Sequence, residues 1–299
     1  MSLRVIVLGA AAGGGLPQWN CGCPNCRAAR EGRIPVATQS SLAVSADGES
    51  WAILNASPDI GRQLLATPEL HPTGPRAVPI RSVLLTNGDI DHVAGLLTLR
   101  EKQAFDLVAT PGIHEVIAAN PIFGALDPSL VARRAVALEE AVALAPGLEA
   151  RLFAVPGKVP LYMEGEGYVE TELEGEQTVG VEIRTEGRRA YYIPGVARVT
   201  ERLAGRIDGA DALFLDGTLW TDDEMLRMGL GQKTGARMGH IAISGPDGSI
   251  AACAGLSLGR RVYVHMNNSN PVLDPASPER AEAEAAGWTV GRDGLRLEI

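Results

Sequence analysis

The segment Leu84–Glu101, LLTNGDIDHVAGLLTLRE, places two carboxylates and one imidazole in a short polar loop between apolar residues. These side chains belong to Asp89, Asp91 and His92. Carboxylate oxygens and imidazole nitrogens are frequent ligands of divalent metal ions in proteins. Asp91 could instead cap the following helix, and residues 87–88 could form a turn, but a helix start needs only one capping side chain. The segment therefore favours a metal site.

Apolar segments flank this loop on both sides. Residues 80–85 are short, apolar and β-branched, which predicts a buried strand. After the loop, Val93, Leu96, Leu97 and Arg100 recur at helical spacing. Loops that lead from a strand to a helix lie at the carboxyl edge of a sheet, where α/β proteins usually carry their sites. We therefore expect an α/β fold with a site at this edge.

Two later strands are expected to end in a polar side chain in the same way. Residues 212–216 form an apolar run that ends in Asp216, and residues 262–265 form one that ends in His265. His240 lies between them in a glycine-rich loop. One histidine at a strand end is often a satisfied core residue, but the repeated arrangement favours convergence of these side chains on one site.

Three cysteines form the pattern C-x-C-x-x-C at Cys21, Cys23 and Cys26. Thiolates at this spacing can surround one tetrahedral zinc ion, which needs a fourth ligand from elsewhere in the chain. A redox pair is the alternative, but three cysteines so close together favour a structural zinc site. Candidates for the fourth ligand are Asn268, Asn270 and a histidine distant in sequence.

The composition is that of an ordinary globular protein, with 299 residues, 45% of them hydrophobic and 21% charged. We expect one domain over residues 1–299. The net charge of −9 and the lack of a long Lys or Arg run argue against nucleic acid as a partner. No apolar run is long enough to span a membrane, and residues 3–8 indicate a first strand rather than a signal peptide, so we expect a cytoplasmic protein. The oligomeric state stays open, with a homodimer as one option.

The rest of the chain alternates between expected strands and helices. The strands cover residues 39–46, 50–55, 105–109, 150–155, 179–184 and 189–193, and the helices cover residues 112–119, 196–204 and a segment that ends near residue 66. An acidic insertion at about residues 157–177 is either a hairpin over the site or a solvated loop. The glycines at residues 9–15 lack the G-x-G-x-x-G spacing, which excludes a dinucleotide fingerprint.

In their order along the chain, these motifs resemble those of the metallo-β-lactamase superfamily. The shared features are a glycine-rich first loop, the three cysteines, the polar loop at residues 86–92, a strand ending in Pro156 and Gly157, and strands ending in Asp216 and His265. The resemblance implies a four-layer αββα sandwich, in which two sheets pack together and helices lie outside.

More narrowly, four segments resemble the family of pyrroloquinoline quinone (PQQ) biosynthesis protein B. They are Asn55–Asp59, Leu85–Glu101, Met238–His240 and His265–Pro271. This resemblance implies an iron-dependent hydroxylase that adds oxygen to the tyrosine ring of a cross-linked Glu-Tyr precursor. The family has also been assigned a role in carrying PQQ or its precursor, so a carrier is the alternative function.

The chain departs from the superfamily signature His-x-His-x-Asp-His. Asn87 and Asp89 stand where the first two histidines would be, and Lys158 stands near the position of a third-motif histidine. The imidazoles that hold the first ion of a two-zinc hydrolase are therefore absent. The loss of these imidazoles and the negative net charge of the chain count against the second alternative function, a metal-dependent phosphodiesterase.

The side chains that remain predict one active-site metal ion. His92, His265 and a carboxylate, favoured as Asp91, would hold it, with Asp89 and Asp216 as further candidate ligands. Two imidazoles and one carboxylate suit the iron(II) of oxygenases, although manganese or zinc also fits such a site. We therefore expect iron(II) here, with another divalent metal as the alternative.

Three side chains are candidates for catalytic roles around this ion. His240 and Asp216 would complete the metal shell or move protons. Lys158 is the third candidate; this lysine, or an arginine near the site, would bind an acidic quinone and so support the carrier function.

Overall fold

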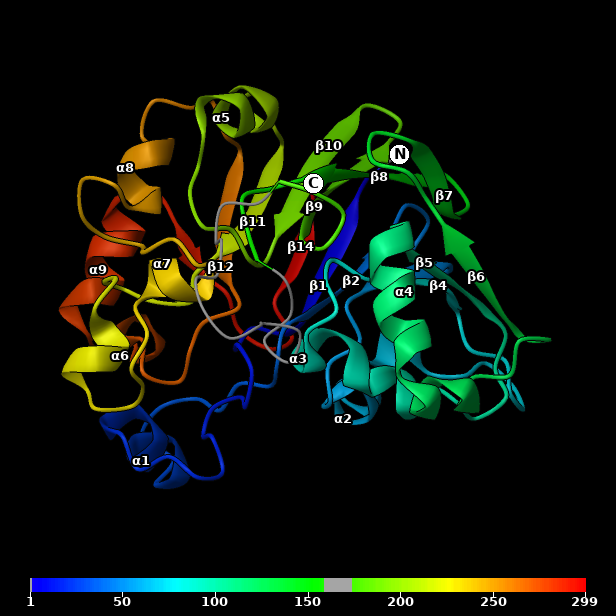
Figure 1. The fold of residues 1–299 in the computed structure, drawn as a ribbon, viewed down its shortest axis with the longest axis horizontal. Coiled ribbons are helices and arrows are strands. Elements are labelled where there is room, and N and C mark those ends of the chain that lie inside the picture. Colours follow the sequence, from blue (N-terminus) through cyan, green and yellow to red (C-terminus); the bar gives the residue numbers. More distant parts are fainter. Residues whose placement is uncertain (1, 159–173) are drawn as a thin grey trace.

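The computed structural model describes residues 2–158 and 174–299. Its centre is a pair of seven-stranded sheets (Figure 1). The first sheet contains, in spatial order, β14 (Arg296–Glu298), β1 (Arg4–Gly9), β2 (Ser41–Ser45), β3 (Trp51–Leu54), β4 (Ile80–Leu84), β5 (Phe105–Ala109) and β6 (Val131–Ala135). The second contains β13 (Thr289–Val290), β12 (Arg260–Val264), β11 (Ala212–Asp216), β10 (Arg188–Ile193), β9 (Val179–Thr185), β8 (Leu148–Ala154) and β7 (Ala141–Ala145).

The two sheets share one pairing pattern. In the first, the strands from β14 to β3 pair antiparallel and those from β3 to β6 pair parallel. In the second, the strands from β7 to β10 pair antiparallel and those from β10 to β13 pair parallel. The parallel strands β4, β11 and β12 lead into the polar loops predicted above, so these loops lie at carboxyl strand ends.

Helices lie on the outer faces of both sheets (Figure 1). On the first sheet, α2 contacts β1 and α4 contacts β6, whereas α9 contacts β13 of the second. The α-helices are α1 (Pro24–Arg30), α2 (Ile60–Leu65), α3 (Ile90–Val93), α4 (Pro111–Ala119), α5 (Glu201–Ile207), α6 (Glu224–Arg227), α7 (Gly235–Met238), α8 (Ser249–Cys253) and α9 (Pro278–Ala285). Short 3-10 helices are η1 (Pro68–Leu70), η2 (Ala94–Leu97), η3 (Pro121–Ala125) and η5 (Pro271–Leu273). No helix in the described ranges is long and apolar enough to cross a membrane.

The hydrophobic core lies between and around the sheets. All residues of β3 and of β11 are buried, as expected for strands that are covered on both faces. Strands β3 and β4 also contact β7, which joins the two sheets. Leu54, Leu84 and Phe214 are among the largest side chains that are fully buried in this core.

The predicted strands are present, but two predicted helices differ from the structure. The helix expected over residues 196–204 is α5, Glu201–Ile207. The backbone N–H groups of Val196 and Ala197 instead bond to the Asp216 carboxylate and to the Pro156 carbonyl, and Thr200 caps the helix. Tertiary hydrogen bonds therefore displace the helix start.

The helix after the polar loop is also shorter than its spacing predicts. It consists of α3 followed by η2, where Gly95 passes close to another backbone segment. Gly95 N donates to the Ala56 carbonyl at 2.9 Å, and an added Cβ would lie 2.1 Å from the Ser57 carbonyl oxygen. This close approach requires glycine.

Four strands, β6, β7, β13 and β14, were not predicted from the sequence. Most of the acidic insertion, residues 159–173, lies outside the described residues, so both alternatives for it, a hairpin over the site and a solvated loop, stay predictions.

Candidate metal centre

A cavity of about 420 Å³ opens where loops from both sheets meet. Its lining includes six of the side chains predicted from the sequence: Asp89, Asp91, His92, Lys158, His240 and His265. Asp216 is fully buried and lies against His240. The fold therefore brings together side chains from segments that are far apart in the sequence.

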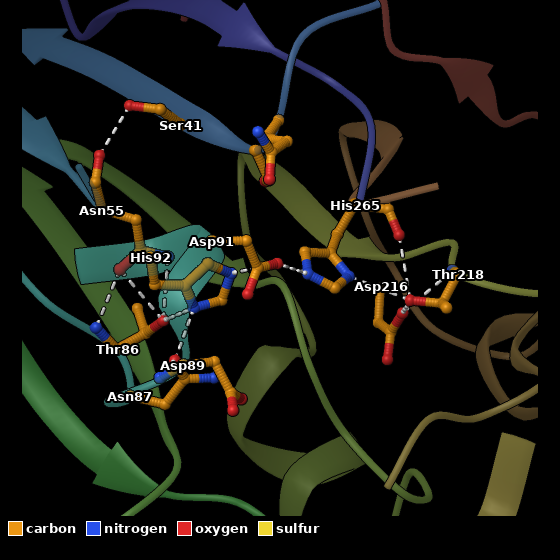
Figure 2. A network of polar contacts seen from close by, with 12 residues as sticks. Ser41, Asn55, Thr86, Asn87, Asp89, Asp91, His92, Asp216, Thr218 and His265 are labelled. Carbon is orange, nitrogen blue, oxygen red and sulfur yellow. Dashed lines mark hydrogen bonds and ion pairs between the residues drawn. The ribbon is translucent and has the colours of Figure 1, made fainter. Parts of the chain in front are cut away.

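The orientation of the His92 ring is fixed by Asn87 (Figure 2). Asn87 Oδ1 accepts the backbone N–H of Asp89 at 3.0 Å, which assigns the oxygen of this amide to the side that faces the ring. His92 Nδ1 lies 2.7 Å from the same oxygen, so Nδ1 carries the proton. The lone pair of the ring therefore lies on Nε2.

The Nε2 atom of His92 is the strongest single indication of a metal ligand. It is buried and has no hydrogen-bond partner among the described residues. Burial lowers the pKa of His92 to about 4, so the ring is neutral near pH 7. A buried polar atom without a partner costs about 1–3 kcal/mol, and the neutral imidazole is a common metal ligand. A metal ion would satisfy this atom.

Asp91 and His265 lie beside His92 (Figure 2). Asp91 Oδ2 is 3.0 Å from His265 Nε2 and 3.8 Å from His92 Nε2. Burial would raise the pKa of Asp91, but attraction to His92 and the hydrogen bond from His265 hold it well below its usual range. The ligand atoms of the three residues lie within 4.8 Å of one another. Such a set can hold one ion and leave other positions open.

The capping alternative for this loop does not fit its geometry. Asp91 lies within α3, and Asp89, which precedes α3, makes no capping hydrogen bond with its side chain. Asp89 lines the cavity, but it is not one of the three residues with clustered ligand atoms. The geometry thus favours Asp91 over Asp89 as a ligand.

Asp216 is placed differently from Asp91. Its Oδ2 accepts hydrogen bonds from His240 Nδ1 at 2.7 Å and from Val196 N at 3.1 Å. Its Oδ1 accepts two more, from the backbone N–H and the hydroxyl of Thr218. Burial would raise the pKa of Asp216, but attraction to His240 lowers it. Although the ligand atoms of Asp216, His240 and His265 also lie within 4.8 Å, four accepted hydrogen bonds favour an orienting role for Asp216.

Thr218 contacts both Asp216 and His265, and so connects the cluster around Asp216 with the cluster around Asp91. The sequence analysis did not identify this residue. Its single hydroxyl proton belongs with Asp216 Oδ1 at 2.6 Å, the shortest of its contacts with the described residues and a contact to a carboxylate. Thr218 Oγ1 therefore accepts from His265 Nδ1 at 2.9 Å. Without a metal ion, His265 Nε2 also carries a proton, which it donates to Asp91 at 3.0 Å, and a bound ion would take the place of this proton. His240 donates from Nδ1 to Asp216, so the lone pair of the neutral His240 ring lies on Nε2.

Asn55 and Thr86 form hydrogen bonds next to His92 that hold the loop carrying this residue. The sequence analysis did not predict these roles. Asn55 has a left-handed φ of 63°, a conformation that asparagine adopts more readily than most residues. Asn55 Oδ1 accepts the Thr86 N–H at 2.9 Å, and its Nδ2 donates to the Thr86 hydroxyl at 2.9 Å. Tyr192 Oη lies 3.3 Å from the same Nδ2. The segment that carries His92 is therefore held by buried polar groups.

Two of the three lysines in the sequence, Lys158 and Lys233, line the cavity. An added Cβ on Gly239 would lie 3.3 Å from Lys158 Cγ, so the Lys158 stem packs along this glycine. Gly239 has a φ of 83°, which favours glycine over other residues. The sequence analysis found Lys158 but not Lys233. Together they add two positive charges, which suit a ligand with carboxylates, to a lining that also carries the carboxylates of Asp89 and Asp91.

The three cysteines form a second candidate metal site at the start of α1. The sulfurs of Cys21, Cys23 and Cys26 lie within 4.8 Å of one another, which fits one zinc ion with Zn–S bonds of about 2.3 Å. Asn268 Nδ2 lies 3.2, 3.4 and 3.3 Å from these sulfurs. Asn270 instead donates to the Gly217 carbonyl, and no histidine of the described chain joins this cluster. Asn268 is thus the best-placed candidate for the fourth ligand.

Known proteins share this architecture. Residues 50–266 match the family model described as beta-lactamase superfamily domain. The coenzyme PQQ synthesis protein B of Ruegeria pomeroyi is 61% identical over 297 residues, which cover 99% of this chain and 100% of that protein. This chain belongs to the PQQ synthesis protein B family.

A solved structure within the PQQ synthesis protein B family supports the fold assignment. The crystal structure of Zn²⁺-bound PqqB from Methylobacterium extorquens has a TM-score of 0.97 and 55% identity, and covers 99% of this chain and 100% of that one. The predicted metallo-β-lactamase fold is therefore confirmed. A diphosphatase of the PhnP family has a TM-score of 0.70 at 20% identity, over 100% of this chain and 98% of that one, which indicates a shared fold alone.

Proposed function

We propose that this chain is an iron(II)-dependent oxygenase of PQQ biosynthesis, which hydroxylates the tyrosine ring of a cross-linked Glu-Tyr precursor. The observation that carries the proposal is the cluster of Asp91, His92 and His265, in which a neutral, buried Nε2 has no partner among the described residues. Two imidazoles and one carboxylate are the ligand set of many iron(II) oxygenases. Membership of the PQQ synthesis protein B family supports the pathway.

The donor set favours one ion over a two-zinc hydrolytic centre. Asn87 and Asp89 replace the first two histidines of the superfamily signature, and Asn87 is bonded to His92. Zinc also fits the remaining ligands, and a relative at 55% identity was solved with Zn²⁺ bound. Because such sites generally bind zinc more tightly than iron(II), the metal found after purification need not be the one that supports activity.

The residues of the cavity have separate roles in this reaction. Bound iron(II) would supply reactivity toward dioxygen. One oxygen atom enters the ring as a hydroxyl and the other leaves as water, so each turnover takes two electrons and two protons from an external reductant. His240, held by Asp216, accepts the phenol proton at Nε2, and Lys158 and Lys233 bind the carboxylates of the substrate.

A carrier for PQQ or its precursor is the second candidate function. The observation that favours it is the presence of two lysines on the cavity wall, which suits a ligand with several carboxylates. A carrier needs affinity for such a ligand but no reaction with oxygen, so the two functions make different predictions.

The test uses protein that keeps the cysteine zinc and is loaded at the second site with either iron(II) or zinc in the absence of air. Oxygen uptake and hydroxylated product are measured with a Glu-Tyr-derived diacid and ascorbate. We expect uptake with iron alone, its loss in His92→Ala and its retention in His71→Ala, where the histidine is exposed. Binding of the diacid or PQQ without oxygen uptake would favour the carrier, and cleavage of a phosphodiester would favour a hydrolase.

A further inference from the structure

A short segment joins the two candidate metal sites. His265 and Asn267 line the active-site cavity, and Asn268 covers the three cysteine sulfurs. Only two residues separate His265 from Asn268. A change in the backbone at the cysteine site can therefore reach a candidate ligand of the other site through a few bonds.

Asn25 in α1 holds the far end of this segment. Its Nδ2 donates to the carbonyl oxygens of Asn268 at 3.0 Å and Asn270 at 2.9 Å. Asn25 lies between Cys23 and Cys26, and Cys23 Sγ is itself 3.7 Å from the Asn268 carbonyl oxygen. The cysteine loop and residues 268–270 thus form one hydrogen-bonded unit.

His265 depends on such restraint because of its backbone conformation. Its φ of 58° lies in the left-handed region, which only a few per cent of residues other than glycine adopt. The near end of the segment is held by Met266 N, which donates to the Ala10 carbonyl, and by Asn267 N, which donates to the Thr218 carbonyl, each at 2.9 Å. The far end is held by the cysteine loop, so both ends are fixed around this unfavourable turn.

We propose that Asn25 and Asn268 are positioning residues for His265, so that zinc at the cysteines strengthens metal binding in the cavity. Zinc fixes the cysteine loop, Asn25 fixes the carbonyls of residues 268 and 270, and the left-handed turn then keeps His265 Nε2 directed at Asp91. The coupling is reciprocal, because the effect of one bound ion on the affinity for the other acts equally in both directions. The inference rests on the ligand set of the proposed function.

The substitution Asn25→Ala tests this coupling without altering a thiol or a residue of the cavity. Protein that holds zinc at the cysteines is titrated with Co(II), and cavity binding is followed by the absorption spectrum of the ion and by metal analysis. We expect Asn25→Ala to bind Co(II) in the cavity about tenfold more weakly, with unchanged zinc content and an altered Co(II) spectrum.

Arg30→Ala is the matched control. Arg30 donates to the carbonyls of Cys21 and Gln18, each at 2.6 Å, and its hydrogen bonds in the described structure do not reach residues 265–270. We expect this variant to bind Co(II) like the wild type. Thermal unfolding of both variants monitors the fold.

Three results would overturn the inference. One is equal Co(II) affinity in Asn25→Ala and the wild type, and another is an equal loss in Arg30→Ala. Loss of zinc in Asn25→Ala would also count against it, because the Asn25 amide bonds to carbonyls rather than to the sulfurs. A wild type that binds no Co(II) in the cavity would instead overturn the proposed function together with the inference.

Discussion

Asn87 Oδ1 lies 2.7 Å from His92 Nδ1, at a chain position where the metallo-β-lactamase signature has a histidine. A position that would supply a ligand to a first metal ion therefore orients a candidate ligand of the remaining one. Asparagine in place of this histidine removes a ligand of the first metal site and orients His92 for the remaining site. This relationship explains how the loop can lose two histidines and still present a well-oriented imidazole.

Replacing Asn87 by Leu should weaken metal binding in the cavity by about 10- to 100-fold, the usual effect of removing a group that orients a metal ligand. Leucine is similar in size but leaves the His92 Nδ1–H without an acceptor. Asn87→Asp keeps an acceptor oxygen and should retain most of the affinity. Competition with a chromophoric chelator measures both, and equal losses in the two variants would contradict the orienting role.

The metal-free protein should lose stability as the pH falls from 6.5 to about 4. The folded-state pKa of His92 is lowered from 6.5 to about 4, mainly by burial, so in this range the unfolded chain binds a proton that the folded chain excludes. Because one pKa unit corresponds to about 1.36 kcal/mol, His92 accounts for a decrease of at most about 3 kcal/mol in the free energy of unfolding over this pH range. Urea unfolding at a series of pH values measures the free energy of unfolding.

His92→Gln is the control for this pH dependence. Burial would lower the pKa of His265, but its hydrogen bond to Asp91 raises it, so the stability that His265 adds is present below 6.5 and lost as the pH rises through its folded pKa. The two histidines thus act in opposite directions. The fall in stability toward acid should be smaller in His92→Gln than in the wild type, and an identical pH profile would refute the assignment to His92.

Lys158→Met and Lys233→Met should each raise the KM for the diacid by about tenfold while changing kcat less, because a charge-assisted contact to a remote carboxylate contributes mainly to substrate binding. Lys102→Met removes the third lysine, which is exposed, and should behave like the wild type. Steady-state kinetics with the diacid and with its neutral ester provide the comparison. If the ester is affected as strongly as the diacid, the lysines do not bind the carboxylates.

Asn268→Ala should lower the zinc affinity of the cysteine site by at least about tenfold, whereas Asn268→Asp should retain zinc. The amide is assigned with its nitrogen toward the sulfurs, and with zinc bound the oxygen would turn to the ion. Zinc content after dialysis against a chelator measures the difference. Full retention of zinc by Asn268→Ala would exclude Asn268 as the fourth ligand.

The candidate ligands could be predicted because each ends an apolar strand or lies in the loop or short helix that follows one. Asp91 and His92 follow β4, Asp216 ends β11, and His265 follows β12. Periodicity locates such strands. The carboxyl ends of parallel strands lie at the same edge of a sheet, so this edge can be predicted without knowing the strand order. The polar residues at these ends therefore predicted a common site.

Other parts of the site could not be predicted, for physical reasons. The role of Thr218 depends on one acceptor, Asp216 Oδ1, and one donor, His265 Nδ1, which come within about 3 Å of its hydroxyl only after the second sheet has formed. The start of α5 was predicted too early because helical spacing carries no information on the bond from Val196 N to Asp216. Lys233 is not part of any motif that the sequence analysis identified, so its place on the cavity wall follows from tertiary structure.

The candidate ligands come from both sheets, and this has a consequence for the thermodynamic stability of the protein. Asp91 and His92 follow a strand of the first sheet, and His265 follows a strand of the second. An ion held by all three would cross-link the halves of the sandwich, and free metal at 100 times its dissociation constant would add about 2.7 kcal/mol to the free energy of unfolding. Resistance to heat and catalytic competence would then be selected together, through the same three side chains.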